Sequence, residues 1–104
     1  MNNYCMIEVA FDSKKEVNKV VDELLDKKLA ASSQVIESNS TWRWNSKKES
    51  SKEYLLFIKT KKSLSDEIYG VIKSIHSYDV FEFAIFDLTS ISSDYLNWIE
   101  KETT

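Results

Sequence analysis

The sequence predicts an α+β fold formed by a single domain over residues 1–104. Short apolar runs, typical of buried strands, alternate along the chain with amphipathic stretches typical of helices. The length is that of one domain, and with one Gly and no Pro the chain contains no flexible or proline-rich linker. Its 42% of hydrophobic residues are enough to form a core.

The first strand and the first helix are predicted from the start of the chain. Residues Tyr4–Phe11 are nearly all apolar, with Glu8 as the only charge, and this pattern indicates a strand that is covered on both faces. Ser13 and Glu16 have the spacing of a capping box, which starts a helix. We expect that helix to end near Lys28, and its apolar stripe consists of Val17, Val20, Val21, Leu24 and Leu25.

The middle of the chain predicts two further strands joined by a charged turn. From Leu29 to Trp44 the pattern is strand-like but polar at many positions, as in a long strand at the edge of a sheet. We expect residues 45–52, rich in serine and in charge, to form the turn. The apolar run from Tyr54 to Ile58 then indicates a second buried strand.

The last third of the chain predicts one more strand between two helices. We expect Ser63 to cap a second helix, whose apolar side consists of Leu64, Ile68, Val71, Ile72 and Ile75. The aromatic and β-branched run from Val80 to Leu88 predicts the fourth strand. Ser92 or Ser93 caps a short final helix, which carries Tyr95, Leu96, Trp98 and Ile99.

This order of strands and helices predicts a ferredoxin-like βαββαβ sandwich followed by a short C-terminal helix. Two split β–α–β units place both long helices on one face of an antiparallel sheet. Because the two buried strands are apolar on both faces, the second face needs a cover larger than the short last helix. An uncovered apolar face is an association surface, and we therefore expect an oligomer.

Charge and composition disfavour several partners and locations. The net charge of −3 disfavours nucleic acid, because its binding depends on basic residues that neutralise phosphates. No apolar stretch approaches the roughly 18 residues of a membrane span, and the N-terminus lacks the pattern of a signal peptide. Cys5 is the only cysteine and cannot form an internal disulfide, which is typical of a reducing compartment. We expect a cytoplasmic protein that binds neither nucleic acid nor membrane.

The sequence lacks the common catalytic motifs. With Gly70 as the only glycine, neither a P-loop nor a dinucleotide-binding loop can form. One cysteine and one histidine are too few for a structural zinc site. Cys5 lies on a predicted buried strand without a base beside it, so we interpret it as a small core residue. We expect a protein that is not an enzyme and requires no cofactor.

Two groups of side chains are candidates for binding. His76, Asp79 and Glu82 lie at the end of the second helix, where imidazole and carboxylate could hold a divalent ion; the alternative is a surface histidine beside an acidic turn. Trp42 and Trp44 alternate along a strand, so both indoles face the same side. They either pack, within the subunit or against a neighbour, or form a ligand platform at a subunit junction.

Five segments in a fixed order resemble the motifs of a known family. They are residues 28–32, 44–47, 53–60, 76–82 and 95–99. In that order they resemble the Lys-Leu-Ala-Ala-Cys, Trp-Glu-Gly-Lys, Glu-x-x-Leu-x-x-Lys-Thr, His-Pro-Tyr-Glu-x-Pro-Glu and Tyr-Leu-x-Trp motifs of the CutA family, the divalent-cation tolerance proteins. The resemblance covers nearly the whole chain.

The resemblance implies a ferredoxin-like subunit in a tight homotrimer and a role in tolerance of copper and other divalent cations, without an established enzymatic reaction. We expect weak binding of a divalent cation such as copper near His76 and Glu82. The alternative, by similarity to the trimeric PII signalling proteins, is a binding or scaffold module for a small ligand or a protein partner. Its site is a cleft between subunits, with residues Trp44, Lys47, Glu53, Lys59, Tyr78 and Glu82.

The chain departs from the family motifs at several positions. Ser77 and Phe81 replace the prolines of the His-Pro-Tyr segment, and Ser46 replaces the hairpin glycine. Val9 stands where some bacterial relatives carry a cysteine implicated in copper binding, and Ile75 replaces the first of two adjacent histidines found in some relatives. We therefore expect any imidazole ligand to be His76, the only histidine.

Overall fold

The computed structural model describes residues 3–104, so the first two residues of the predicted domain lie outside it. Within these residues the strands and helices follow the predicted order: β1 (Tyr4–Phe11), α1 (Lys14–Asp26), β2 (Ser32–Trp44), β3 (Lys47–Lys61), the 3₁₀ turn η1 (Lys62–Leu64), α2 (Ser65–Ile75), β4 (Phe83–Asp87) and α3 (Ser93–Glu102). The strands form one antiparallel sheet in the order β2-β3-β1-β4. The predicted α+β fold and the edge position of β2 are confirmed.

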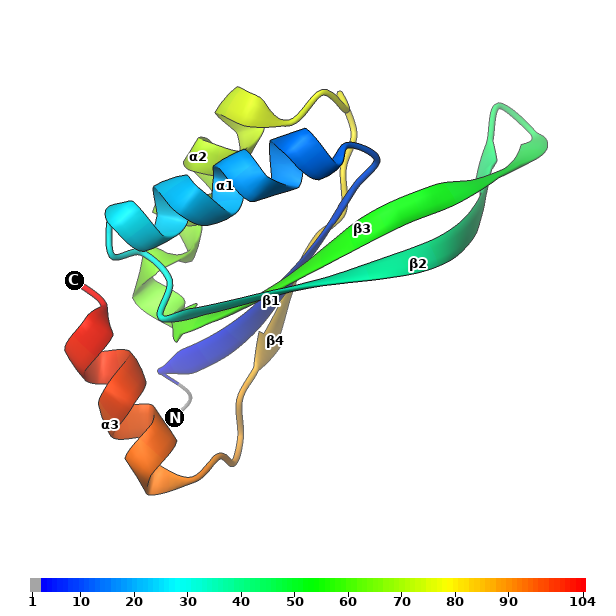
Figure 1. The fold of residues 1–104 in the computed structure, drawn as a ribbon. Helices are drawn as coiled ribbons and strands as arrows, with labels where there is room; N and C mark the ends of the chain where they lie inside the picture. The colour runs from blue at the N-terminus through cyan, green and yellow to red at the C-terminus, as the bar shows by residue number, and fades with distance from the viewer. Residues whose placement is uncertain (1–2) are drawn as a thin grey trace.

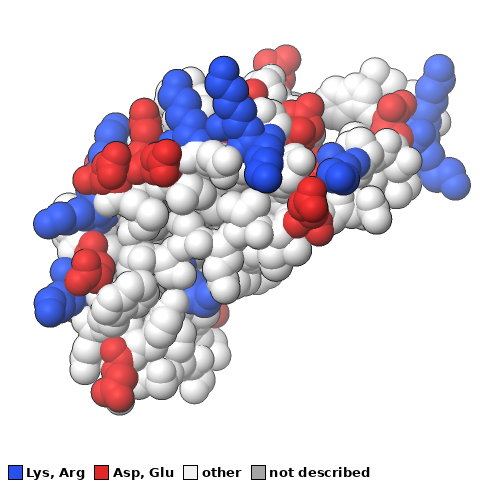
Figure 2. All heavy atoms as spheres, in the orientation of Figure 1, with Lys and Arg blue, Asp and Glu red and all other residues white. Residues whose placement is uncertain are grey.

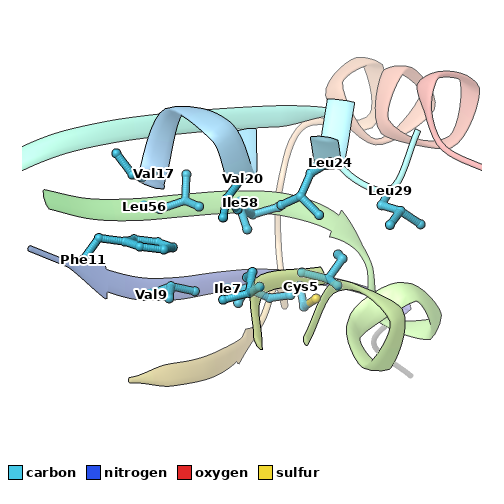
Figure 3. Close-up of a cluster of buried hydrophobic side chains, with 13 residues drawn as sticks. Cys5, Ile7, Val9, Phe11, Val17, Val20, Leu24, Leu29, Leu56 and Ile58 are labelled. Carbon is cyan, nitrogen blue, oxygen red and sulfur yellow. The ribbon is translucent and has the colours of Figure 1, made fainter. Parts of the chain in front are cut away.

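Helices α1 and α2 lie side by side on one face of the sheet, and α3 lies near the end of the sheet opposite the tip of the β2–β3 hairpin (Figure 1). The core fills the space between the sheet and the two helices (Figure 3). Its sheet side consists of Cys5, Ile7, Val9, Phe11, Leu56 and Ile58. Burial raises the pKa of the Cys5 thiol, and the interpretation of Cys5 as a core residue is confirmed.

Helix α1 begins at the predicted cap, but the capping box is only half formed. The backbone N–H of Glu16 donates to Ser13 Oγ at 3.2 Å. The carboxylate of Glu16 instead accepts a hydrogen bond from the backbone N–H of Ser77 at 2.9 Å. The side chain that would close the box therefore ties α1 to the loop after α2.

Strand β3 is much longer than the sequence pattern predicts. The turn predicted for residues 45–52 is wrong, because residues 38–44 pair with residues 47–53 along the whole hairpin. The turn itself is only Asn45 and Ser46, whose φ angles of 51° and 65° are left-handed. The apolar run covers only the part of β3 that lies beneath the helices. Beyond it, the backbone hydrogen bonds between β2 and β3 continue, but the side chains of β3 are polar.

The ends of several other elements also differ from the predictions. Strand β2 begins at Ser32 and not at Leu29. Ser63 does not cap α2, because it lies inside η1 and the helix begins at Ser65. Strand β4 is shorter than predicted, since only residues 83–87 pair with β1. Ser92 occupies the position before α3 but makes no side-chain capping bond.

The second face of the sheet is largely apolar and carries neither α1 nor α2, although Glu8, Gln34 and Lys59 also lie on it by register. By register, its side chains include Met6, Ile36, Leu55, Phe57, Ala84 and Phe86. Helix α3 reaches this face only at its end, where Tyr4 donates to Glu100 at 2.6 Å and Lys61 lies 3.3 Å from the same carboxylate. In Figure 2, Lys and Arg gather over the helices and at the hairpin tip, whereas a wide uncharged area lies along the strands.

Among residues 3–104, no helix has the length and hydrophobicity that crossing a membrane requires.

Helix α1 offers a matched test of this core. Leu24 is fully buried whereas its neighbour Leu25, predicted to share the apolar stripe, is 43% exposed. Leu24→Ala should lower the free energy of unfolding by about 2–5 kcal/mol, because it leaves a cavity in the core. Leu25→Ala should change it by about 0.5 kcal/mol or less. Denaturant titration of both variants measures the difference, and equal losses would contradict this packing.

Candidate functional site

A cleft of about 890 Å³ lies between the β2–β3 hairpin and the loop that joins α2 to β4. One wall is a face of the hairpin that carries Trp42, Trp44, Glu49 and Glu53. Residues 78–82 form the opposite wall. Its size is within the range of small-molecule sites.

His76 holds the loop wall of the cleft in place. Its ring is stacked between Phe11 and Phe81, with ring centroids 4.3 and 4.7 Å away. Its Nε2 lies 2.7 Å from the carbonyl oxygen of Ala10, and its Nδ1 accepts from the backbone N–H of Tyr78 at 3.1 Å. Since Nδ1 accepts, the proton sits on Nε2 and is donated to Ala10. The alternative interpretation of His76 as a surface side chain is wrong, because only 8% of the residue is exposed.

Tyr78 connects the two walls of the cleft. Its hydroxyl donates to Glu53 Oε2 at 2.9 Å, and Glu53 is only 7% exposed. Burial and this bond to a carboxylate raise the pKa of the Tyr78 hydroxyl. The tyrosine therefore stays protonated and acts as a donor that fixes the orientation of Glu53.

Glu82 and Glu8 form a carboxyl pair at the edge of this site. Loss of hydration, a hydrogen bond with Glu8 and the nearby charges of Glu8 and Glu53 raise the pKa of Glu82 to about 7. Sequence reasoning missed Glu8 as a site residue. The available signal was that Glu8 is the only charge in an otherwise apolar strand.

The side chains predicted to bind metal have few neighbours that could complete a site. Among residues 3–104, no three His, Cys, Asp or Glu side chains gather in a group that could hold a metal ion. His76 could ligate a metal only by giving up one of its two ring hydrogen bonds. A metal site at His76 and Glu82 stays a prediction.

The structure brings together most, but not all, of the predicted cleft residues. Trp44, Glu53, Tyr78 and Glu82 line the same cleft. Lys47 pairs with Trp44 at the hairpin tip and lies outside the lining. Lys59 donates to Gln34 at 3.2 Å and is also outside the lining of the cleft. Trp42 and Trp44 do share one face of the hairpin, as predicted.

Comparison with known proteins identifies the family. The family model for CutA1 divalent ion tolerance protein matches residues 5–102. This chain belongs to the CutA1 family. The divalent-cation tolerance protein CutA of Pyrococcus horikoshii is 32% identical over 98 residues, which cover 94% of this chain and 96% of that relative.

Other CutA1 relatives agree with this assignment. The crystal structure of CutA1 from Oryza sativa superposes with a TM-score of 0.93 at 27% identity, covering 99% of this chain and 95% of the other. The chloroplastic protein CutA of Arabidopsis thaliana is 29% identical over 99 residues, covering 94% of this chain. The chain spans 54% of the length of that plant relative.

The carboxyl pair of this CutA1 chain predicts a specific pH dependence of stability. The pKa of Glu82 rises from 4.5 to about 7, so between these values the folded chain keeps a proton that the unfolded chain releases. The stability that this proton contributes is present below about pH 4.5 and is lost as the pH rises through about 7.

Glu82→Gln cannot release this proton, so its free energy of unfolding should fall less than that of the wild type between about pH 5 and pH 8. Chemical denaturation at both pH values measures the difference. Glu67→Gln, which changes an exposed carboxyl on α2, is the matched control and should follow the wild type. Parallel pH profiles for wild type and Glu82→Gln would contradict the raised pKa.

Proposed function

We propose that this chain is a non-enzymatic, homotrimeric protein of divalent-cation tolerance that binds a divalent cation such as copper weakly. Membership of the CutA1 divalent ion tolerance family supports the role. The observation that carries the proposal at residue level is the carboxyl pair of Glu82 and Glu8, with Glu53 close enough to add its charge.

A divalent cation is suited to this carboxyl pair for a simple electrostatic reason. Two ionised carboxylates that share a site repel each other. This repulsion is relieved when Glu82 keeps a proton. A divalent cation replaces that proton and cancels both charges. Because the pair supplies only oxygen ligands and few of them, binding is weak. Cu²⁺ binds better than Mn²⁺ or Zn²⁺ at almost any nitrogen or oxygen site.

An exposed apolar face on the single subunit supports the trimer. The second face of the sheet exposes apolar side chains such as Ile36 and Phe86, which are 53% and 46% exposed. Burying such a face between identical chains is the usual route to a closed homo-oligomer. The sole cysteine, Cys5, lies in the core without a disulfide, which supports a cytoplasmic location.

A second candidate function is favoured by the shape of the cleft. Trp42, Trp44 and Tyr78 line a space large enough for a small molecule, and metal binding gives indoles no role. This arrangement supports a binding or scaffold module, with the cleft receiving a small ligand or a protein partner.

Copper titration by calorimetry tests the metal proposal. Wild type should bind Cu²⁺ with a Kd that is roughly micromolar or weaker. Glu82→Gln should abolish binding, whereas Cys5→Ser should leave it unchanged because the thiol is in the core. Binding should also fade below about pH 6, since protons compete for the carboxyl pair.

The same titration on His76→Ala distinguishes the two predicted ligands. If copper binding survives in Glu82→Gln and is lost in His76→Ala with the fold intact by circular dichroism, the imidazole is the ligand and the carboxyl pair is not. If neither the wild type nor any variant binds copper, the metal proposal is wrong and the scaffold module is favoured.

Sedimentation tests the trimer. Wild type should have a mass of about 36 kDa, three times the 12.1 kDa chain. Phe86→Glu places a charge on the apolar sheet face and should shift the mass toward the monomer. Leu25→Glu introduces the same charge at a similarly exposed leucine on α1 and should leave the mass unchanged. A wild-type monomer at micromolar concentration would rule out the assembly.

A further inference from the structure

Glu8 and Lys59 place opposite charges on the second face of the sheet, among apolar side chains such as Met6, Phe57 and Phe86. The proposed homotrimer buries this face between chains. A charge that is enclosed in an apolar interface is strongly unfavourable unless an opposite charge meets it. Each of these two charges therefore needs a partner once the chains have assembled.

Lys59 has no carboxylate partner within its own chain. Its Nζ donates to Gln34 Oε1 at 3.2 Å, and the amide of Gln34 is neutral. Among residues 3–104, no carboxylate lies within ion-pair distance of this ammonium group. Glu8 is a diagonal neighbour, since it lies opposite Phe57 and Lys59 lies opposite Met6. Lys59 nevertheless reaches toward β2, on the side of β3 away from Glu8.

The carboxyl pair lies on the other half of the same face. Glu8 is on β1, and Glu82, which shares a hydrogen bond with it, comes just before the edge strand β4. The strand order β2-β3-β1-β4 therefore separates the lysine half of the face from the carboxyl half. Within the described part of the chain, neither Glu8 nor Glu82 forms an ion pair with a Lys or an Arg.

A closed ring of identical chains can bring these two halves together. In such a ring each contact joins two different surfaces, one from each neighbour. Both halves also carry apolar side chains: Ile36 and Leu55 lie on the β2–β3 half, and Ala84 and Phe86 on the β1–β4 half. Opposite charges at matching places in an apolar contact fix its register and disfavour arrangements that bring like charges together.

We propose that in the homotrimer Lys59 of each chain forms an ion pair with the carboxyl pair, Glu8 and Glu82, of the next chain. The inference rests on the proposed homotrimer and names the residues that fix its register. The carboxyl site is then incomplete in a single chain. An ammonium group and a copper ion compete for the same carboxylates, which is a further reason for the metal to bind weakly.

Mixing two charge-reversed chains tests this pairing. One chain carries Lys59→Glu, and the other carries both Glu8→Lys and Glu82→Lys. Alone, each should dissociate at a concentration about tenfold or more above that of the wild type, because like charges then meet between chains. Refolded together, the two should form trimers that contain both chains in excess of the random share, since most contacts in such a trimer again join opposite charges. Native mass spectrometry with one chain isotopically labelled measures the composition.

Two further variants are the controls. A chain with all three changes restores opposite charges between neighbours and should assemble like the wild type. If this chain is folded by circular dichroism but monomeric, the charges do not act as a pair and the proposal is overturned. Lys15→Glu reverses an exposed charge on α1 and should leave the dissociation concentration unchanged.

The outcomes separate this pairing from the proposed assembly. A wild-type monomer removes the homotrimer and this pairing with it. If the wild type is a trimer but the charge-reversed chains assemble equally well, or mix only at random, the pairing is overturned and the homotrimer stands. Random mixing is also what an ion pair between Lys59 and Glu8 of the same chain predicts, so preferential mixing is the result that supports contact between chains.

Discussion

Strand β1 hydrogen-bonds to β3 along one edge and to β4 along the other, and the two long helices pack on the face formed by its odd-numbered side chains. A strand in this position cannot slip by one residue, because its whole apolar set would leave the core. Its register therefore places β3 and β4, and with them both walls of the cleft. Glu8 lies on the same strand but on the opposite face, where it meets Glu82.

The loop wall of the cleft is held by packing rather than by backbone stiffness. The family motif has prolines where this chain has Ser77 and Phe81, so the loop lacks two residues that would fix φ. Phe81 instead stacks on His76, whose ring also stacks on Phe11 and hydrogen-bonds to the backbone on both sides. The histidine that sequence reasoning assigned to metal is thus also the structural centre of the loop.

Strands and helices that bury an apolar face could be predicted from the sequence, and their ends could not. Tyr4–Phe11 was recognised in full because its side chains are apolar on both faces. The outer half of β3 was missed, since a hairpin held by backbone hydrogen bonds leaves little trace in side-chain polarity. In the cleft, the proximity of Glu53 and Tyr78 came from a family motif, whereas the pairing of Glu8 with Glu82 depends on strand register, which the pattern alone does not give.

The burial of Cys5 has a practical consequence for how the opening of this subunit can be followed. It is the only thiol in the chain, it has no exposed surface, and burial raises its pKa, so the reactive thiolate is both scarce and covered. A thiol reagent can reach it only when the sheet and the helices separate. The rate of labelling of the unmodified protein therefore reports how often the core opens, without an engineered probe.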